Sequence, residues 1–185
     1  KADGGDFRGG DFFYSRRIGQ EINFDDDEFV NPNEELVDYD NKPKLINAIK
    51  FSGTTNKKLS IALLNAVTGK VNATIRNIDD GSVRKENLAP VTNYNVISLT
   101  QQLLNDYSSL GIHNTNVNRA DGGLNANNTV FVTDLFDEKR NFNFSSRFYF
   151  SKAPRLSEKN GFRGSVSFEE LRGNVQLAAG WVGTD

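Results

Sequence analysis

The chain has 185 residues, 37% of them hydrophobic, and its 22 basic and 24 acidic residues leave a net charge of −2. No run approaches the roughly 18 to 20 apolar residues of a membrane-spanning helix, so a helical membrane protein is excluded. Charges of the two signs are interspersed, so the chain lacks the electrostatic footprint of a nucleic-acid binder. Because cysteine is absent, disulfide frameworks, thiolate catalysis and zinc–thiolate sites are excluded as well.

Period-two alternation of apolar and polar residues recurs along the chain and predicts a mainly β structure. We expect strands at 10–20, 44–54, 59–69, 92–103, 108–118, 129–137, 141–151, 163–170 and 174–182. Short polar connections alternate with longer ones, of which 21–43 and 70–91 are the longest. This rhythm is typical of an up-and-down outer-membrane barrel, which has tight turns on the periplasmic side and loops outside.

The segment 141–151 shows the alternation most clearly. One of its faces carries four phenylalanines: Phe142, Phe144, Phe148 and Phe150. Its other face is polar and includes Arg147 and Tyr149. A sandwich core would mix large and small aliphatic residues, whereas repeated phenylalanine suits lipid. We therefore predict that the four phenylalanines face lipid and that Arg147 and Tyr149 line the lumen of a barrel.

Lys50 lies between Ile49 and Phe51 in the expected strand 44–54. A charge at the lipid midplane costs about 2 to 4 kcal/mol, so we expect Lys50 to point into the lumen as well. The predicted fold class is therefore all-β, an antiparallel up-and-down transmembrane β-barrel. Because an open sheet edge in lipid leaves backbone groups unsatisfied, we expect residues 1–185 to be the N-terminal part of a larger barrel domain.

The acidic segment 21–43 allows two interpretations. Asp25, Asp27 and Glu35, with asparagines between them, present oxygen ligands of the kind that calcium prefers. No glycine stands where the loop of an EF-hand requires its sharp turn, so a solvated acidic loop is the alternative. No other metal and no cofactor is predicted.

The single histidine, His113, lies two residues before Thr115, on the same face of an expected strand. A histidine beside a hydroxyl is the start of a nucleophilic site. A lumen or surface histidine without a nucleophile is the simpler interpretation. We expect no enzymatic activity.

Several short motifs carry a family resemblance. They are Phe13-Tyr14-Ser15-Arg16-Arg17-Ile18-Gly19, Phe51-Ser52-Gly53-Thr54, Leu59-Ser60-Ile61-Ala62-Leu63-Leu64-Asn65-Ala66-Val67-Thr68, Thr92-Asn93-Tyr94 and Val117-Asn118-Arg119. In order and spacing they resemble the start of the barrel in a bacterial outer-membrane protein family without a known activity. In that family an N-terminal module similar to family-nine carbohydrate-binding domains precedes the barrel. The resemblance implies a bacterial outer-membrane location and a module upstream of Lys1 that is not part of this chain.

Two classes of function remain open. The first is an outer-membrane β-barrel that serves as a channel, receptor or scaffold for envelope transport. Its partners would be outer-membrane lipid, other envelope proteins and, through the resemblance, carbohydrate. The second is a soluble all-β binding or adhesion domain. In a barrel the phenylalanines of 141–151 are bare to lipid, whereas in a sandwich they are buried against a second sheet.

Overall fold

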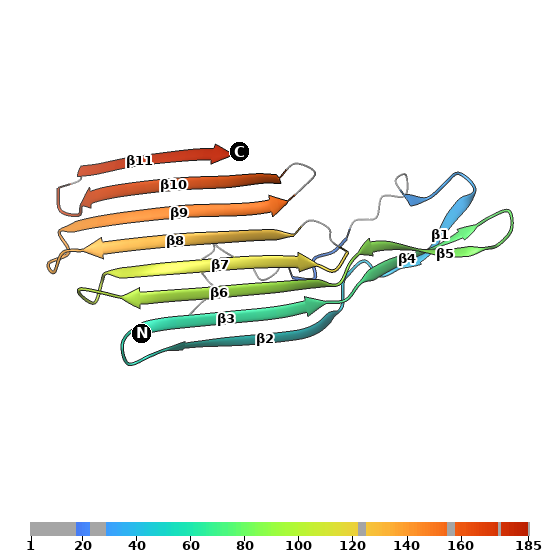
Figure 1. Ribbon diagram of the computed structural model, residues 1–185, viewed down its shortest axis with the longest axis horizontal. Helices are drawn as coiled ribbons and strands as arrows, with labels where there is room; N and C mark the ends of the chain where they lie inside the picture. Colours follow the sequence, from blue (N-terminus) through green and yellow to red (C-terminus); the bar gives the residue numbers. More distant parts are fainter. Residues whose placement is uncertain (1–17, 23–28, 122–124, 155–157, 174, 185) are drawn as a thin grey trace.

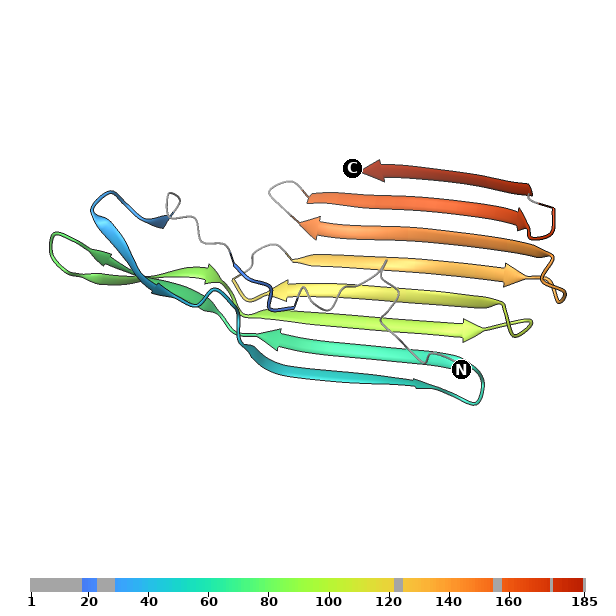
Figure 2. The same cartoon turned by 180° about the vertical axis from the view of Figure 1, so that it is seen from behind.

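The computed structural model describes residues 18–22, 29–121, 125–154, 158–173 and 175–184. Its strands form an eight-stranded sheet in the order β11-β10-β9-β8-β7-β6-β3-β2 and a three-stranded sheet in the order β1-β4-β5. The small sheet lies beyond one end of the large one (Figure 1, Figure 2). The strands are β1 (Glu34–Tyr39), β2 (Leu45–Thr54), β3 (Leu59–Thr68), β4 (Val71–Asn77), β5 (Val83–Ala89), β6 (Thr92–Gln102), β7 (Ser109–Arg119), β8 (Ala126–Phe136), β9 (Phe142–Pro154), β10 (Glu158–Glu170) and β11 (Val175–Thr184).

The large sheet is a meander of hairpins into which β4 and β5 are inserted. Strands β6 to β11 pair antiparallel in sequence order, and their registers contain no shift. The predicted all-β, antiparallel architecture is therefore confirmed. Among the described residues, β2 and β11 each have a single neighbouring strand, so this sheet does not close on itself.

The small sheet continues the ladder of β3 and β6 past a break. At the end of β3, Thr68 pairs with Thr92 of β6, and shortly beyond it Val71 of β4 pairs with Ala89 of β5. Pro90, between β5 and β6, has no backbone N–H and does not fit inside a ladder. Strands β4 and β5 therefore leave the large sheet as a pair. β1 joins β4 as the third strand of the small sheet.

The prediction that 21–43 and 70–91 are long loops is wrong for most of 70–91 and for Glu34–Tyr39 within 21–43. The second segment is mostly the β4–β5 hairpin, and β1 occupies part of the first. In β4, Val71, Ala73 and Ile75 are 2%, 0% and 0% exposed, and polar residues alternate with them. This period-two pattern is visible in the sequence. The turn-forming residues Asp79-Asp80-Gly81-Ser82 that follow it favour the prediction of a loop.

The expected strands from 44–54 onward all occur, and most of their ends lie within two residues of those predicted, whereas the small-sheet ends of β8, β9 and β10 extend three to five residues further. The first expected strand, 10–20, lies outside the described residues except for 18–20, which are not in a strand.

Two connections at the small-sheet end are shorter than the predicted 119–128 and 152–162. The first shortens because β8 begins at Ala126, and the second because β9 extends to Pro154 and β10 begins at Glu158. The long connection that remains within the large sheet is the one occupied by β4 and β5. The alternation of short and long connections is therefore weaker in the structure than in the sequence pattern.

Tight turns join the strands at the end of the large sheet opposite the small sheet (Figure 1). Between β8 and β9, Asp137 Oδ1 accepts hydrogen bonds from the backbone N–H groups of Asn141 at 2.6 Å and Phe142 at 2.8 Å. Between β2 and β3, Thr55 Oγ1 accepts one from the N–H of Leu59 at 3.1 Å. A side chain at the start of each turn thus satisfies backbone donors, which explains why polar residues occupy these positions.

Left-handed backbone conformations occur at Lys58, Leu104 and Arg140, with φ of 61°, 61° and 54°. Each of these residues lies in one of the tight turns. The left-handed conformation costs an ordinary L-residue about 1 to 2 kcal/mol. Leu104 is 87% exposed, so packing of its side chain does not offset this cost.

Leu104→Asn is therefore expected to raise the free energy of unfolding by about 0.5 to 1 kcal/mol, because asparagine tolerates the left-handed region. The matched variant Leu104→Val is expected to lower it, because β-branched residues are disfavoured there. Unfolding by urea measures both changes. Equal midpoints for the wild type and the two variants would contradict strain at this turn.

Candidate functional site

The two faces of the large sheet differ in the chemistry of their side chains. Residues paired across antiparallel strands project to the same face, and successive residues of one strand alternate between faces. The registers place Phe131, Phe148 and Trp181 on one face, which we call the phenylalanine face. Arg147 and Tyr149 project from the opposite face, which we call the polar face.

Large apolar side chains are exposed on the phenylalanine face along all eight strands. Their exposure runs from 37% for Ile112 to 67% for Leu177. On the polar face, Val182 of the edge strand β11 is also exposed. The exposed apolar residues of the phenylalanine face are Ile49, Phe51, Leu63, Ile97, Leu110, Ile112, Phe131, Phe142, Phe144, Phe150, Phe162, Phe168, Val175, Leu177 and Trp181.

The four phenylalanines predicted to face lipid all belong to this face. Phe142, Phe144 and Phe150 are 43%, 40% and 50% exposed. Phe148 is half-buried and packs beside Trp181, with 5.7 Å between ring centroids. Within the described ranges the small sheet lies beyond the end of the large one and does not cover these rings.

The predicted lumen residues Lys50, Arg147 and Tyr149 share the polar face. Two small residues of β3 on this face, Ala62 and Ala66, are both buried. Lys50 is exposed, whereas the Nε of Arg147 is buried and has no hydrogen-bond partner among the described residues. The polar face therefore combines small side chains with charged groups of both signs, since Asp134 and Glu169 project from it as well.

His113 also lies on the polar face, next to a serine that the sequence did not single out. The Oγ of Ser98 in β6 and the Nδ1 of His113 in β7 are 2.8 Å apart and share a hydrogen bond. Thr115, the hydroxyl considered from the sequence, projects to the same face. Ser98 was missed because it comes from the neighbouring strand, and only the β6–β7 register brings it opposite His113.

Asparagines occupy the end of the phenylalanine face that adjoins the small sheet. We call this set the asparagine belt: Asn47, Asn65, Asn93, Asn95, Asn114, Asn116, Asn118, Asn127 and Asn160. Asn65 Nδ2 donates to the Oδ1 atoms of Asn93 at 2.7 Å and Asn95 at 2.8 Å. Asn114 Nδ2 donates to Asn127 Oδ1 at 3.1 Å. The amides thus bond to one another across strands and form a polar border to the apolar surface.

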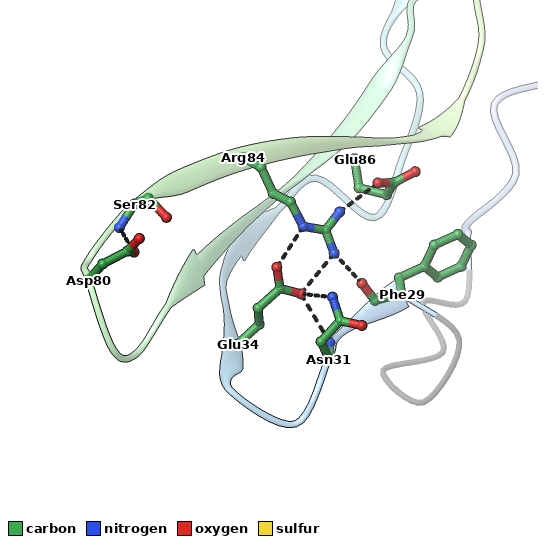
Figure 3. Close-up of polar contacts among 7 residues, drawn as sticks. All are labelled: Phe29, Asn31, Glu34, Asp80, Ser82, Arg84 and Glu86. Carbon is green, nitrogen blue, oxygen red and sulfur yellow. Dashed lines mark hydrogen bonds and ion pairs between the residues drawn. The ribbon is translucent and has the colours of Figure 1, made fainter.

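A polar cluster holds the small sheet together (Figure 3). Arg84 of β5 donates from Nε to Glu34 Oε1 and from Nη2 to Glu34 Oε2, both at 2.9 Å. It also donates to Glu86 Oε2 at 2.7 Å and to the carbonyl oxygen of Phe29 at 2.6 Å. Asn31 donates to Glu34 Oε2 from its backbone N at 3.0 Å and its Nδ2 at 2.8 Å. These bonds join β1, β5 and the segment that precedes β1.

The cluster changes the acidity of its members. Hydrogen bonds from Arg84, and then from Asn31, lower the pKa of Glu34 from 4.5 to about 2. Pairing with Glu34 raises the pKa of Arg84. In the β4–β5 turn, hydrogen bonds from Ser82 lower the pKa of Asp80, and the Ser82 N–H donates to Asp80 Oδ1 at 2.8 Å (Figure 3). Both carboxylates are therefore ionised and hydrogen-bonded at neutral pH, which stabilises local structure.

The three calcium candidates are not brought together in the part of the chain that the structure describes. Asp25 and Asp27 lie outside that part. Glu35, on β1, forms an ion pair with Arg76 of β4, whose Nε donates to Glu35 Oε1 at 2.7 Å. No group of three or more His, Asp or Glu side chains in the described ranges is placed to hold a metal ion. Calcium binding by this segment stays a prediction.

Acid is expected to loosen the small sheet. The pKa of Glu34 is about 2 in the folded chain, below its ordinary 4.5. Its stabilising contribution is therefore complete above about pH 4.5 and is lost as the pH falls towards 2. Glu34→Gln is expected to remove this part of the pH dependence and to speed hydrogen exchange in β1 and β5 at neutral pH.

Hydrogen exchange measured by mass spectrometry, corrected for the intrinsic effect of pH, tests this expectation. Glu21→Gln is a matched control, because Glu21 forms an exposed ion pair with Lys42 at 2.7 Å, outside the cluster. Unchanged protection of β1 and β5 in Glu34→Gln would show that the cluster does not hold the small sheet.

Comparison with known proteins identifies the family of this chain. No helix in the described part of the chain is long and apolar enough to cross a membrane. Neither a curated protein nor a solved structure matches the chain. The model of a domain of unknown function, DUF5916, matches residues 4–182, and its description names neither a membrane nor a carbohydrate. This match spans almost the whole chain and includes all or most of every strand of the large sheet. The protein therefore belongs to the DUF5916 family.

Proposed function

We propose that this chain forms part of the wall of a bacterial outer-membrane β-barrel. In this arrangement the phenylalanine face contacts lipid and the polar face lines the interior. The observation that carries the proposal is the exposure of large apolar side chains on one face of all eight strands. Extended apolar patches on soluble monomers are rare and mark surfaces that contact a membrane or another protein.

Strand length supports the same proposal. The strands of the large sheet contain 10 to 13 residues. A tilted β-strand needs about 9 to 11 residues to cross the hydrocarbon core. Every strand of this sheet is thus long enough to span a bilayer.

The apolar surface also has a polar border at each end. The asparagine belt forms the border next to the small sheet. At the opposite end, Lys58 and Asp106 form an ion pair between neighbouring turns, and the Arg140 guanidinium lies 4.7 Å from the centroid of the Tyr107 ring. Polar, charged and aromatic residues are expected where a membrane-spanning sheet enters the headgroup regions.

The open edges of the sheet are consistent with a larger barrel. Edge strands β2 and β11 are exposed along most of their length. In lipid each unsatisfied backbone group costs several kcal/mol, so both edges need partner strands. We propose that further strands pair with β2 and β11 and close the wall.

The polar face suggests what such a barrel does. Lys50 and Arg147 would place positive charge beside a water-filled interior, where charged side chains tune ion selectivity. A channel, a receptor and a scaffold for envelope transport all fit this interior, and carbohydrate is a candidate cargo through the family resemblance. The alternative, a soluble adhesion domain, requires a second layer over the phenylalanine face.

Phe148→Arg tests the proposed contact with lipid, because Phe148 is the middle residue of β9. Near the bilayer midplane an arginine on the lipid face costs about 2 to 4 kcal/mol, so we expect this variant to fold poorly into lipid vesicles. Ser145→Arg is the matched control, because Ser145 lies on the polar face of the same strand and pairs with Asp134. Protection from protease in vesicles measures folding. Equal folding of both variants, or folding of the wild type in water without an amphiphile, would favour the soluble alternative.

A topological test addresses the orientation. The β2–β3, β6–β7 and β8–β9 turns lie at one end of the large sheet and the small sheet lies beyond the other (Figure 1). We expect a tag at Gly81, in the β4–β5 turn, to be labelled on intact cells. A tag at Lys139, in the β8–β9 turn, is expected to be labelled only after the outer membrane is opened. The reverse pattern would mean that the small sheet faces the periplasm.

A further inference from the structure

A hollow of about 360 Å³ lies on the phenylalanine face where the apolar surface meets the asparagine belt. It spans β8, β9 and β10. Two rows of paired residues form its floor: Phe150 pairs with Phe162, and in the next row Lys152 pairs with Asn160 and with Asn127. One half of the hollow is therefore aromatic, and the other half offers a cation and two amides.

Each of the two aromatic rings of the floor also packs against a residue outside the hollow. The Phe150 ring makes an edge-to-face contact with Phe131, with centroids 6.0 Å apart. The Phe162 ring covers Gly183 of β11, where a Cβ atom would lie 2.3 Å from two of its ring carbons. Glycine at position 183 thus leaves room for this ring. A larger residue would displace the ring, and β9 is the side on which it has space.

The polar half of the hollow is suited to bind a ligand that carries an anionic group beside hydroxyl groups. Lys152 is exposed, and no carboxylate belongs to the described lining of the hollow. The amide of Asn127 is held in place by Asn114, whose Nδ2 donates to its Oδ1 at 3.1 Å. An ammonium group binds a phosphate oxygen by a charge-assisted hydrogen bond, and amides both donate to and accept from hydroxyl groups.

We propose that this hollow binds the headgroup of a phosphorylated glycolipid. Its phosphate lies at Lys152, its sugar hydroxyls lie at Asn127 and Asn160, and its acyl chains extend over Phe150 and Phe162 onto the apolar surface. This inference rests on the proposed function, because acyl chains reach the hollow only if the phenylalanine face lies in lipid. The volume falls within the range of about 300 to 1,000 Å³ typical of small-ligand sites.

A glycolipid explains the combination of groups better than simpler ligands do. A phospholipid would use the cation and the rings but has few hydroxyl groups for the amides. A free sugar would use the amides but neither the cation nor the adjoining apolar surface. The asparagine belt next to the hollow extends the amide surface, as an oligosaccharide headgroup would require.

The full chain, folded in phosphatidylcholine vesicles, provides the test. Each vesicle sample also contains one probe lipid: an acylated disaccharide bisphosphate, the same lipid without phosphates, or phosphatidylglycerol. After extraction in mild detergent, native mass spectrometry measures how much probe stays bound. We expect the wild type to retain the phosphorylated disaccharide lipid and to retain the other two at least about tenfold less.

Two variants test the two halves of the hollow. Lys152→Gln removes the cation, and Gly183→Ala displaces the Phe162 ring without a change in charge. Each is expected to lower retention of the phosphorylated disaccharide lipid about tenfold. Lys139→Gln is the control, because Lys139 is an exposed lysine in the β8–β9 turn at the other end of the sheet. Protease protection in the vesicles verifies that each variant is folded.

The possible outcomes separate the two proposals. Equal retention of phosphatidylglycerol, or of the lipid without phosphates, would overturn the glycolipid assignment and leave the barrel wall intact. Unchanged retention in both Lys152→Gln and Gly183→Ala would overturn the hollow as the site. A chain that does not enter vesicles at all would overturn the proposed function, and this inference with it.

Discussion

An unbroken antiparallel ladder is the constraint on which the rest of this structure depends. From β3 to β11 the registers run across the large sheet without a shift, and the irregular pairing lies at the start of β2, near Leu45. Side chains alternate along each strand, so a slip of one residue in any pair would exchange the two faces from that strand onward. The continuous ladder therefore keeps the phenylalanine face apolar and the polar face polar over eight strands.

The ladder ends where the β3–β6 pair bends away to form the small sheet. Gly69 N donates to the carbonyl oxygen of Lys44 at 2.8 Å, and Ala120 N donates to that of Val91 at 3.0 Å. These bonds satisfy backbone groups at the junction, where Pro90 removes a donor. Beyond it, the small sheet combines the buried side chains of Val71, Ala73 and Ile75 with its own ion-pair cluster. In the proposed barrel this sheet projects past the asparagine belt, away from lipid.

The border between the apolar surface and the asparagine belt connects the proposed function with the proposed lipid site. A membrane-spanning sheet must change from apolar to polar where the acyl chains end, and a lipid headgroup meets the protein at that level. The hollow at Lys152 lies on this border. The position of the Phe162 ring, which lines the hollow, depends on Gly183 of the edge strand β11, because a Cβ atom at this position would collide with the ring.

Local patterns by themselves determined much of this protein. Alternation within 141–151 was enough to separate Phe144 from Arg147, and polar turn residues were enough to place the tight turns, because both signals act between residues close in sequence. The sequence also limited the fold to antiparallel β-sheets. The tertiary structure alone decided which residues of different strands are neighbours. The departure of the small sheet depends on the bend at Pro90, whereas the asparagine belt, the contact of Ser98 with His113 and the hollow depend on register. Local patterns do not encode these arrangements, because they arise from pairing between segments far apart in the chain.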